Sequence, residues 1–127
     1  MEAKASHRFA RITPRKARVI LDMVRGQHVA EALDQLKFTR KAAAPLVIKL
    51  IDSAISNAQI KDKQVKLDRL YVKTAFADGA PDRHMIRWRP RAQGRATPIQ
   101  KGMAHLTIIV DEKKDAKQGQ QQGKKEE

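Results

Sequence analysis

The sequence predicts an α+β fold with three candidate strands, about three helices and one long arm. Three observations predict it. Apolar residues alternate with a period of two near the start, in the middle and near the end of the chain, as in strands that bury one face. Between the first two of these segments, apolar residues recur at helical spacing. An arginine-rich connection, residues 78–103, joins the last two.

The candidate strands differ in the strength of their alternation. The first is the weakest and the last is the clearest, because the last runs through aliphatic residues. The residues that share one face are Ala5, His7 and Phe9 in the first strand, Leu70, Val72, Thr74 and Phe76 in the second, and Leu106, Ile108 and Val110 in the third.

Three helices are expected between the first two strands. Thr13 and Pro14 begin the first, and Gly26 ends it after residue 25. Thr39 is expected to cap the third, which runs to about Ile60 and has a kink or a ragged first turn at Pro45. The apolar faces are Ala17, Ile20, Leu21 and Val24 in the first helix, Val29, Ala32, Leu33 and Leu36 in the second, and Leu46, Val47, Leu50, Ile51, Ala54 and Ala58 in the third.

The connection over residues 78–103 is too long for an ordinary loop and has too few apolar residues for a core of its own. If the flanking strands pair antiparallel, it forms an arm that turns near Gln93 and Gly94. About ten residues on each side, at roughly 3.3 Å per residue, reach about 33 Å from the body.

The expected domain organisation is one globular unit, residues 1–112, that includes this arm, followed by a disordered tail, residues 113–127. Acids and lysines balance in the last seventeen residues, so the formal net charge of +13 falls on residues 1–110. Such a charge favours a polyanionic partner, above all nucleic acid, over an anionic membrane surface or a merely soluble basic surface. We expect no membrane span and no secretory signal, and therefore a cytoplasmic protein.

Nothing in the sequence indicates an enzyme. The chain has no cysteine, which excludes a thiol nucleophile and a thiolate metal site. Its four histidines, His7, His28, His84 and His105, fall on separate elements without metal-ligand spacing. Asp78, Asp82 and His84 lie close in sequence, but at the base of an arm without a shielded pocket, so a metal-assisted nuclease is disfavoured. We expect no catalytic residue, no metal and no cofactor.

Among nucleic-acid readers, a helix-turn-helix over Pro14–Lys37 is disfavoured, because Glu31 and Asp34 on its second helix would meet phosphates. The chain has only five aromatic residues, too few for a base-stacking sheet. Recognition of RNA backbone and shape remains, and we expect its cations to lack acidic partners. The expected RNA-binding residues are Arg11, Arg15, Lys16, Arg18, Arg25, Arg83, Arg87, Arg89, Arg91, Arg95 and Lys101. Replacing Arg15, Arg18 and Arg25 by glutamine should then weaken RNA binding and leave the melting temperature nearly unchanged.

Four motifs in this order resemble the family of large ribosomal subunit protein 22, in its bacterial type. They are Thr13-Pro14-Arg15-Lys16-Ala17-Arg18 with Arg25-Gly26, Ser53-Ala54-Ile55-Ser56-Asn57-Ala58, Arg89-Pro90-Arg91-Ala92-Gln93-Gly94-Arg95-Ala96, and His105 before the last strand. The resemblance covers residues 5–112 and implies a three-stranded antiparallel sheet packed on about three helices, with a long protruding β-hairpin arm.

The resemblance also implies a function: a structural constituent of the large ribosomal subunit that binds large-subunit rRNA and assists subunit assembly. The body would lie near the polypeptide exit and the hairpin would line the nascent-chain tunnel. The implied partners are large-subunit rRNA, neighbouring large-subunit ribosomal proteins and the nascent polypeptide, with no membrane and no stable homo-oligomer. The implied tunnel-lining residues are Met85, Arg87, Trp88, Arg91, Ala92, Gln93 and Gly94. The alternative function is a free nucleic-acid chaperone or a DNA-binding protein.

The chain departs from the family pattern around the arm. Ile86 stands where the family often has lysine, and Gly102, Met103 and Ala104 replace basic and hydroxyl residues. About three more residues than usual lie between Gly79 and Met85, so we expect a bulge at the base of the arm.

Overall fold

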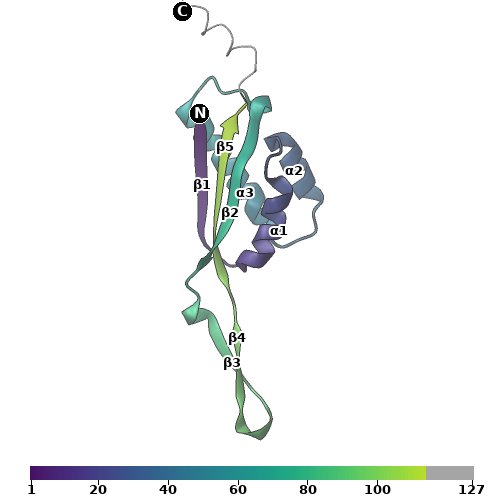
Figure 1. Cartoon of the computed structure of the whole chain (residues 1–127), viewed down its shortest axis with the longest axis vertical. Helices are drawn as coiled ribbons and strands as arrows, with labels where there is room; N and C mark the ends of the chain where they lie inside the picture. The colour runs from purple at the N-terminus through teal and green to yellow at the C-terminus, as the bar shows by residue number, and fades with distance from the viewer. Residues whose placement is uncertain (114–127) are drawn as a thin grey trace, which may run out of the picture.

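The structure, a computed structural model, describes residues 1–113. Except for Lys113, the tail expected over residues 113–127 lies outside the described residues. A compact body carries both described ends of the chain, and a thin arm projects from the opposite end of the body (Figure 1). The arm keeps the range 78–103 used above, so its first and last residues still belong to the strands of the body.

The sheet of the body has three antiparallel strands, β1 (Glu2–Ala10), β2 (Leu70–Ala80) and β5 (Met103–Glu112), in the order β1-β5-β2. The central strand is β5, and its Ile108 lies between Ala5 of β1 and Ala75 of β2. The expected α+β class and the expected three-stranded antiparallel sheet are confirmed. The arm continues β2 and β5 beyond their last pair, Ala80 with Met103, so it projects from the ends of the central strand and one edge strand.

Three helices follow β1 along the chain: α1 (Pro14–Val24), α2 (Val29–Phe38) and α3 (Ala43–Lys61). Helix α1 packs against β2, α3 packs against β1 and β5, and α2 packs against α3 (Figure 1). The apolar face predicted for α1 is confirmed, since Ala17, Ile20, Leu21 and Val24 are all fully buried. Helix α3 adds Val47, Leu50, Ile51, Ala54 and Ala58 to the same core.

Thr39 does not cap the third helix as expected. It ends α2, and its hydroxyl donates a hydrogen bond to the Gln35 carbonyl (2.8 Å). Helix α3 begins later, at Ala43, so Pro45 lies in its first turn. A backbone N–H has no partner in the helix at that position, and the proline is accommodated without a break.

The buried faces of β1 and β2 change phase at bulges that the alternation did not indicate. In β2 the register shifts between Val72 and Thr74, which places Ala75 and Ala77 in the core and leaves Phe76 exposed. The expectation that Thr74 and Phe76 share the core face with Leu70 and Val72 is therefore wrong.

In β1 the shift lies between His7 and Ala10. Phe9 takes a positive φ of 56° and is exposed, and Ala10 is buried in its place. The expectation that Ala5, His7 and Phe9 share one face is therefore wrong for Phe9, because one extra residue after His7 reverses the side to which later side chains point.

The arm is a two-stranded hairpin of β3 (Ile86–Pro90) and β4 (Ala96–Gln100). It turns where expected: Gln93 and Gly94 have φ values of 59° and 66°, and the Arg91 amide donates to the Arg95 carbonyl (2.7 Å). At its base, residues 81–85 lie between the last pair of the body and the first pair of the hairpin, against only residues 101–102 on the return. The expected bulge is therefore present.

Candidate nucleic-acid interface

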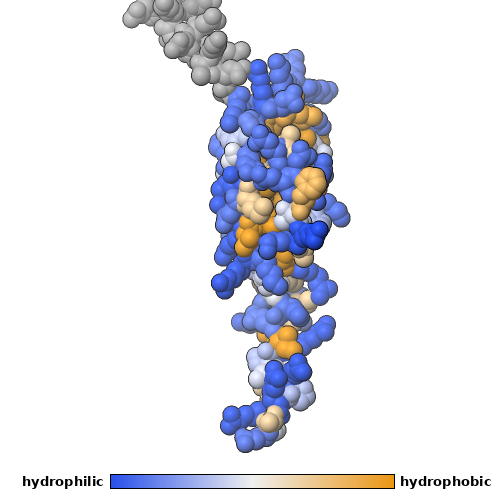
Figure 2. All heavy atoms as spheres, turned by 90° about the vertical axis from the view of Figure 1, so that its right-hand side faces the viewer, coloured by the Kyte–Doolittle hydropathy of each residue, from blue (hydrophilic) through white to orange (hydrophobic). Residues whose placement is uncertain are grey.

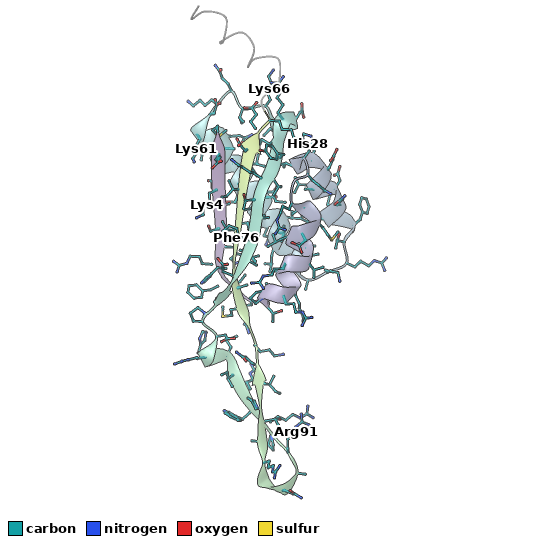
Figure 3. The ribbon with its side chains drawn as sticks, viewed as in Figure 1. Lys4, His28, Lys61, Lys66, Phe76 and Arg91 are labelled. Atoms are coloured by element: carbon teal, nitrogen blue, oxygen red, sulfur yellow. The ribbon has the colours of Figure 1, made fainter. Side chains whose placement is uncertain are left out.

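The arm presents its cations to solvent. Every residue from Ile86 to Lys101 is exposed, and none of residues 83–101 is acidic. Figure 2 shows the arm as mostly hydrophilic, with most of the apolar atoms in view on the body. Arg91 lies far from the body (Figure 3), where its Nε donates to the Thr97 hydroxyl (3.0 Å). A projecting surface of arginines without acids attracts polyanions and presents forked donors to phosphates.

The hairpin has two different faces. Successive side chains of a strand point to opposite sides, and Arg87 and Arg89 are two residues apart with Trp88 between them. The arginine face therefore includes Ile99 and Thr97, which pair with Arg87 and Arg89, whereas Trp88 and its partner Pro98 lie on the other face. The structure thus does not bring the predicted tunnel-lining residues together on one side, since Arg87 and Trp88 point apart.

The predicted RNA-binding residues of α1, together with Arg25, which directly follows it, divide into two pairs. Arg15 and Lys16 are exposed, and the structure gives them no protein partner. Arg18 donates from Nε (3.2 Å) and Nη2 (3.0 Å) to the Ala77 carbonyl. Arg25 donates from Nε to the Ala75 carbonyl (3.2 Å) and from Nη1 to Asp22 (2.7 Å). The expectation that these cations lack acidic partners is wrong for Arg25, which pairs with Asp22. Arg18 has no acidic partner over residues 1–113, but its donors, like those of Arg25, cover a carbonyl on the free edge of β2.

Four predicted cations from separate parts of the chain meet where the arm joins the body. Arg11, Lys16, Arg87 and Lys101 all line one groove of about 400 Å³, together with Thr13 at the N-terminal end of α1. We call this space the root groove. Among residues 1–113, no acidic residue lines it.

Two smaller hollows adjoin the root groove. One, of about 310 Å³, shares Lys16 with it and adds Lys41. The other, of about 290 Å³, shares Leu46 with it and adds Arg8 and Lys49. In the described part of the chain, no acidic residue lines either hollow. Sequence reasoning missed Arg8, Lys41 and Lys49, because they stand alone on different elements and no motif connects them.

At the end of the body away from the arm, two cations are neutralised by acids. Lys73 contacts the carboxylates of Glu2 and Asp111, and the Met1 ammonium lies 3.1 Å from Asp111. The hydrogen bond to Glu2 raises the pKa of Lys73. Partial burial alone would raise the pKa of Asp111, but hydrogen bonds from the N-terminal ammonium and the Glu112 amide lower it overall.

The histidines and acids do not form a metal site in the part of the chain that the structure describes: no three His, Asp or Glu side chains there could hold an ion together. Asp82 accepts a hydrogen bond from Gln100 Nε2 (2.8 Å), and His105 Nδ1 accepts one from the Phe9 amide (3.0 Å). Asp78, Asp82 and His84, close as they are in sequence, form no such group of three among residues 1–113. Over residues 1–113, no helix has the length and apolar character needed to cross a membrane.

Known proteins resemble this chain over most of its length. The sequence profile of the family described as ribosomal protein L22p/L17e matches residues 5–111. Large ribosomal subunit protein uL22 of Sorangium cellulosum (strain So ce56) is 49% identical over 90% of this chain and all of its own length. The uL22 protein of Macrococcus caseolyticus (strain JCSC5402) is 50% identical over 89% of both chains. That of Staphylococcus aureus (strain JH9) is 47% identical over 93% of this chain and 99% of its own.

Proposed function

Because this chain belongs to the ribosomal protein L22p/L17e family, we propose that its arm and the cations at the root of the arm bind large-subunit rRNA. The chain is a large-subunit ribosomal protein like its relatives, which are named as ribosomal proteins and not as enzymes. It works in the ribosome and therefore in the cytoplasm.

The observation that carries this proposal is the arm itself: an exposed hairpin with six cations and no acid between residues 83 and 101. Such a segment gains little from folding against its own protein, because none of its side chains from Ile86 to Lys101 is buried. Phosphates would neutralise these cations, and each one neutralised releases counterions. RNA is therefore the partner that the arm fits best.

The two faces of the hairpin differ, so RNA would bind on one of them only. The arginine face, with Arg87 and Arg89, would hold RNA, and the face with Trp88 and Pro98 would remain available to another partner. This agrees with a hairpin that lies along the wall of the nascent-chain tunnel, with rRNA on one side and the passing polypeptide near the other. The body would then lie near the polypeptide exit, beside neighbouring large-subunit proteins, and would hold rRNA segments in place during assembly.

Sedimentation of the full chain with large subunits through a gradient of moderately high salt tests this function. A structural constituent sediments with the large subunit, because many phosphate contacts at a specific binding site hold it there. The alternative, a free nucleic-acid chaperone or DNA-binding protein, is stripped under the same conditions because its contacts are few and interchangeable. Loss of the chain from the subunit fraction, with recovery of the other large-subunit proteins, would favour the alternative.

A further inference from the structure

The root groove combines a cationic rim with an apolar floor. The rim consists of the exposed side chains of Arg11, Lys16, Arg87 and Lys101. The lining also includes Ile12 and Met103, each only 8% exposed. Leu46 and Met85 are half-buried and complete the apolar part of the lining. A site that bound phosphate alone would need only the rim.

The rim cations have no acid to neutralise them within residues 1–113. No ion pair of Arg11, Lys16, Arg87 or Lys101 is found there, whereas Lys73 at the far end of the body contacts two carboxylates. Four like charges around one groove repel each other until an anion enters. The groove is therefore arranged for a ligand that brings negative charge.

The floor indicates what else the ligand carries. The volume of the whole root groove, about 400 Å³, lies in the range of small-ligand pockets. Thioethers such as those of Met85 and Met103 adapt in shape and make favourable contacts with aromatic rings. Single-stranded loops and bulges of RNA offer aromatic rings of this kind, because their unstacked bases are splayed out and accessible to protein side chains.

We propose that the root groove holds one unstacked nucleotide of the bound RNA, with its phosphate at the cationic rim and its base against Met85 and Met103. This inference rests on the proposed RNA binding and names a site within it. The adjoining hollows, with Lys41 on one side and Arg8 and Lys49 on the other, would carry the phosphates before and after that nucleotide.

The four methionines of the full chain provide the test. Met85 and Met103 line the groove, and Met1 and Met23 lie outside it. With methyl-labelled methionine, a short single-stranded oligoadenylate should shift the Met85 and Met103 signals through the ring current of the base and leave the other two in place. Inorganic phosphate should not reproduce these shifts, and Ala42→Leu, which fills the groove from an exposed position without changing charge, should abolish them.

A second variant tests the rim. Lys16→Gln with Lys101→Gln should lower the logarithmic salt slope of oligoadenylate binding by up to about 0.7, because the rim holds one phosphate of the bound nucleotide and each phosphate contributes about 0.7. Lys63→Gln with Lys66→Gln is the matched control, because it removes the same charge from the connection that follows α3. Figure 3 shows Lys61 and Lys66, which bracket Lys63 in sequence, at the end of the body away from the arm, so the slope should stay unchanged.

Two results would overturn the inference. If phosphate alone reproduces the methionine shifts, the groove binds an anion and no base. If oligoadenylate leaves Met85 and Met103 unshifted while the full chain still binds large-subunit rRNA, the groove is not a nucleotide site and the proposed function stands. Failure of the full chain to bind that rRNA at all would instead refute the proposed function.

Discussion

Replacing Arg18 and Arg25 together by methionine removes the contacts that cover the free edge of the sheet. Strand β2 is an edge strand, so its outward carbonyls have no partner strand. Arg18 covers the Ala77 carbonyl through two donors at 3.0 and 3.2 Å, and Arg25 covers the Ala75 carbonyl from Nε at 3.2 Å. Methionine keeps an unbranched side chain about as long as the aliphatic part of arginine but donates no hydrogen bond. At position 18, inside α1, it also keeps the helix propensity.

The expected loss follows from these bonds. A hydrogen bond to a charged group contributes roughly 1.5–3 kcal/mol when it is protected. Arg18 and Arg25 are exposed, and water can replace the lost donors, so about 1 kcal/mol for each arginine is the appropriate figure. The double variant should therefore lose about 2 kcal/mol of unfolding free energy, or about 8 °C in Tm for a domain of this size.

Thermal unfolding of the full chain, followed by circular dichroism, measures this loss. The matched control is Arg15→Met with Lys16→Met, which removes the same charge from the exposed side of α1, at residues for which the structure shows no protein partner over residues 1–113. The control should change Tm by no more than about 2 °C. Equal melting temperatures for the two double variants would refute the assignment of Arg18 and Arg25 to the sheet edge.

Two further predictions concern packing and titration. Gly102→Val should lower the free energy of unfolding in urea by about 1–3 kcal/mol, because a Cβ there would lie only 3.1 Å from Thr13 Cγ2. The control Gly79→Val, where a Cβ meets nothing within 4 Å, should lower it less. Equal losses for the two variants would contradict this. Asp111→Asn should destabilise the body at neutral pH, because the folded state lowers the pKa of Asp111 through its contact with the Met1 ammonium. A carboxylate whose pKa is lower in the folded state stabilises that state above its unfolded pKa of about 3.9, and this stabilisation is lost as the pH falls through the folded pKa. The difference in free energy of unfolding between Asp111→Asn and the unchanged chain should therefore shrink in acid. A difference that is constant with pH would contradict this.

Helix α1 shows what the sequence can predict. Its buried residues Ala17, Ile20, Leu21 and Val24 all follow from helical spacing, and its end at Gly26, with a φ of 80°, follows from the backbone freedom of glycine. These features depend on residues close together in the chain. The turn of the arm at Gln93 and Gly94 could be predicted for the same reason.

The phase of β2 could not be predicted, because a bulge is set by packing across the sheet. Alternation alone favours Phe76 as the core residue, since it is the larger apolar side chain. The shift after Val72 instead buries Ala75 and Ala77 on the side where α1 packs, and small residues there allow a close approach of the helix.

The candidate site was predicted in part. The cations of the arm follow from composition, because an arginine-rich stretch with too few apolar residues for a core has to be exposed. Their convergence could not be predicted: Arg11 and Lys101 meet in the root groove only because β1 and β5 are neighbours in the sheet. The bonds of Arg18 and Arg25 to β2 carbonyls depend equally on the position of α1.

The central claim is that a folded body carries a separate RNA-binding arm, and deletion of residues 83–101 tests it most directly. The remaining Pro81, Asp82 and Gly102 would close the last pair of the body, Ala80 with Met103, as a short hairpin turn. The body should still fold, because the deleted segment contributes no fully buried residue. Removing six cations should reduce the logarithmic salt slope of rRNA binding by roughly 4 to 5, measured as affinity against salt concentration. An unfolded body, or a salt slope equal to that of the full chain, would contradict the claim.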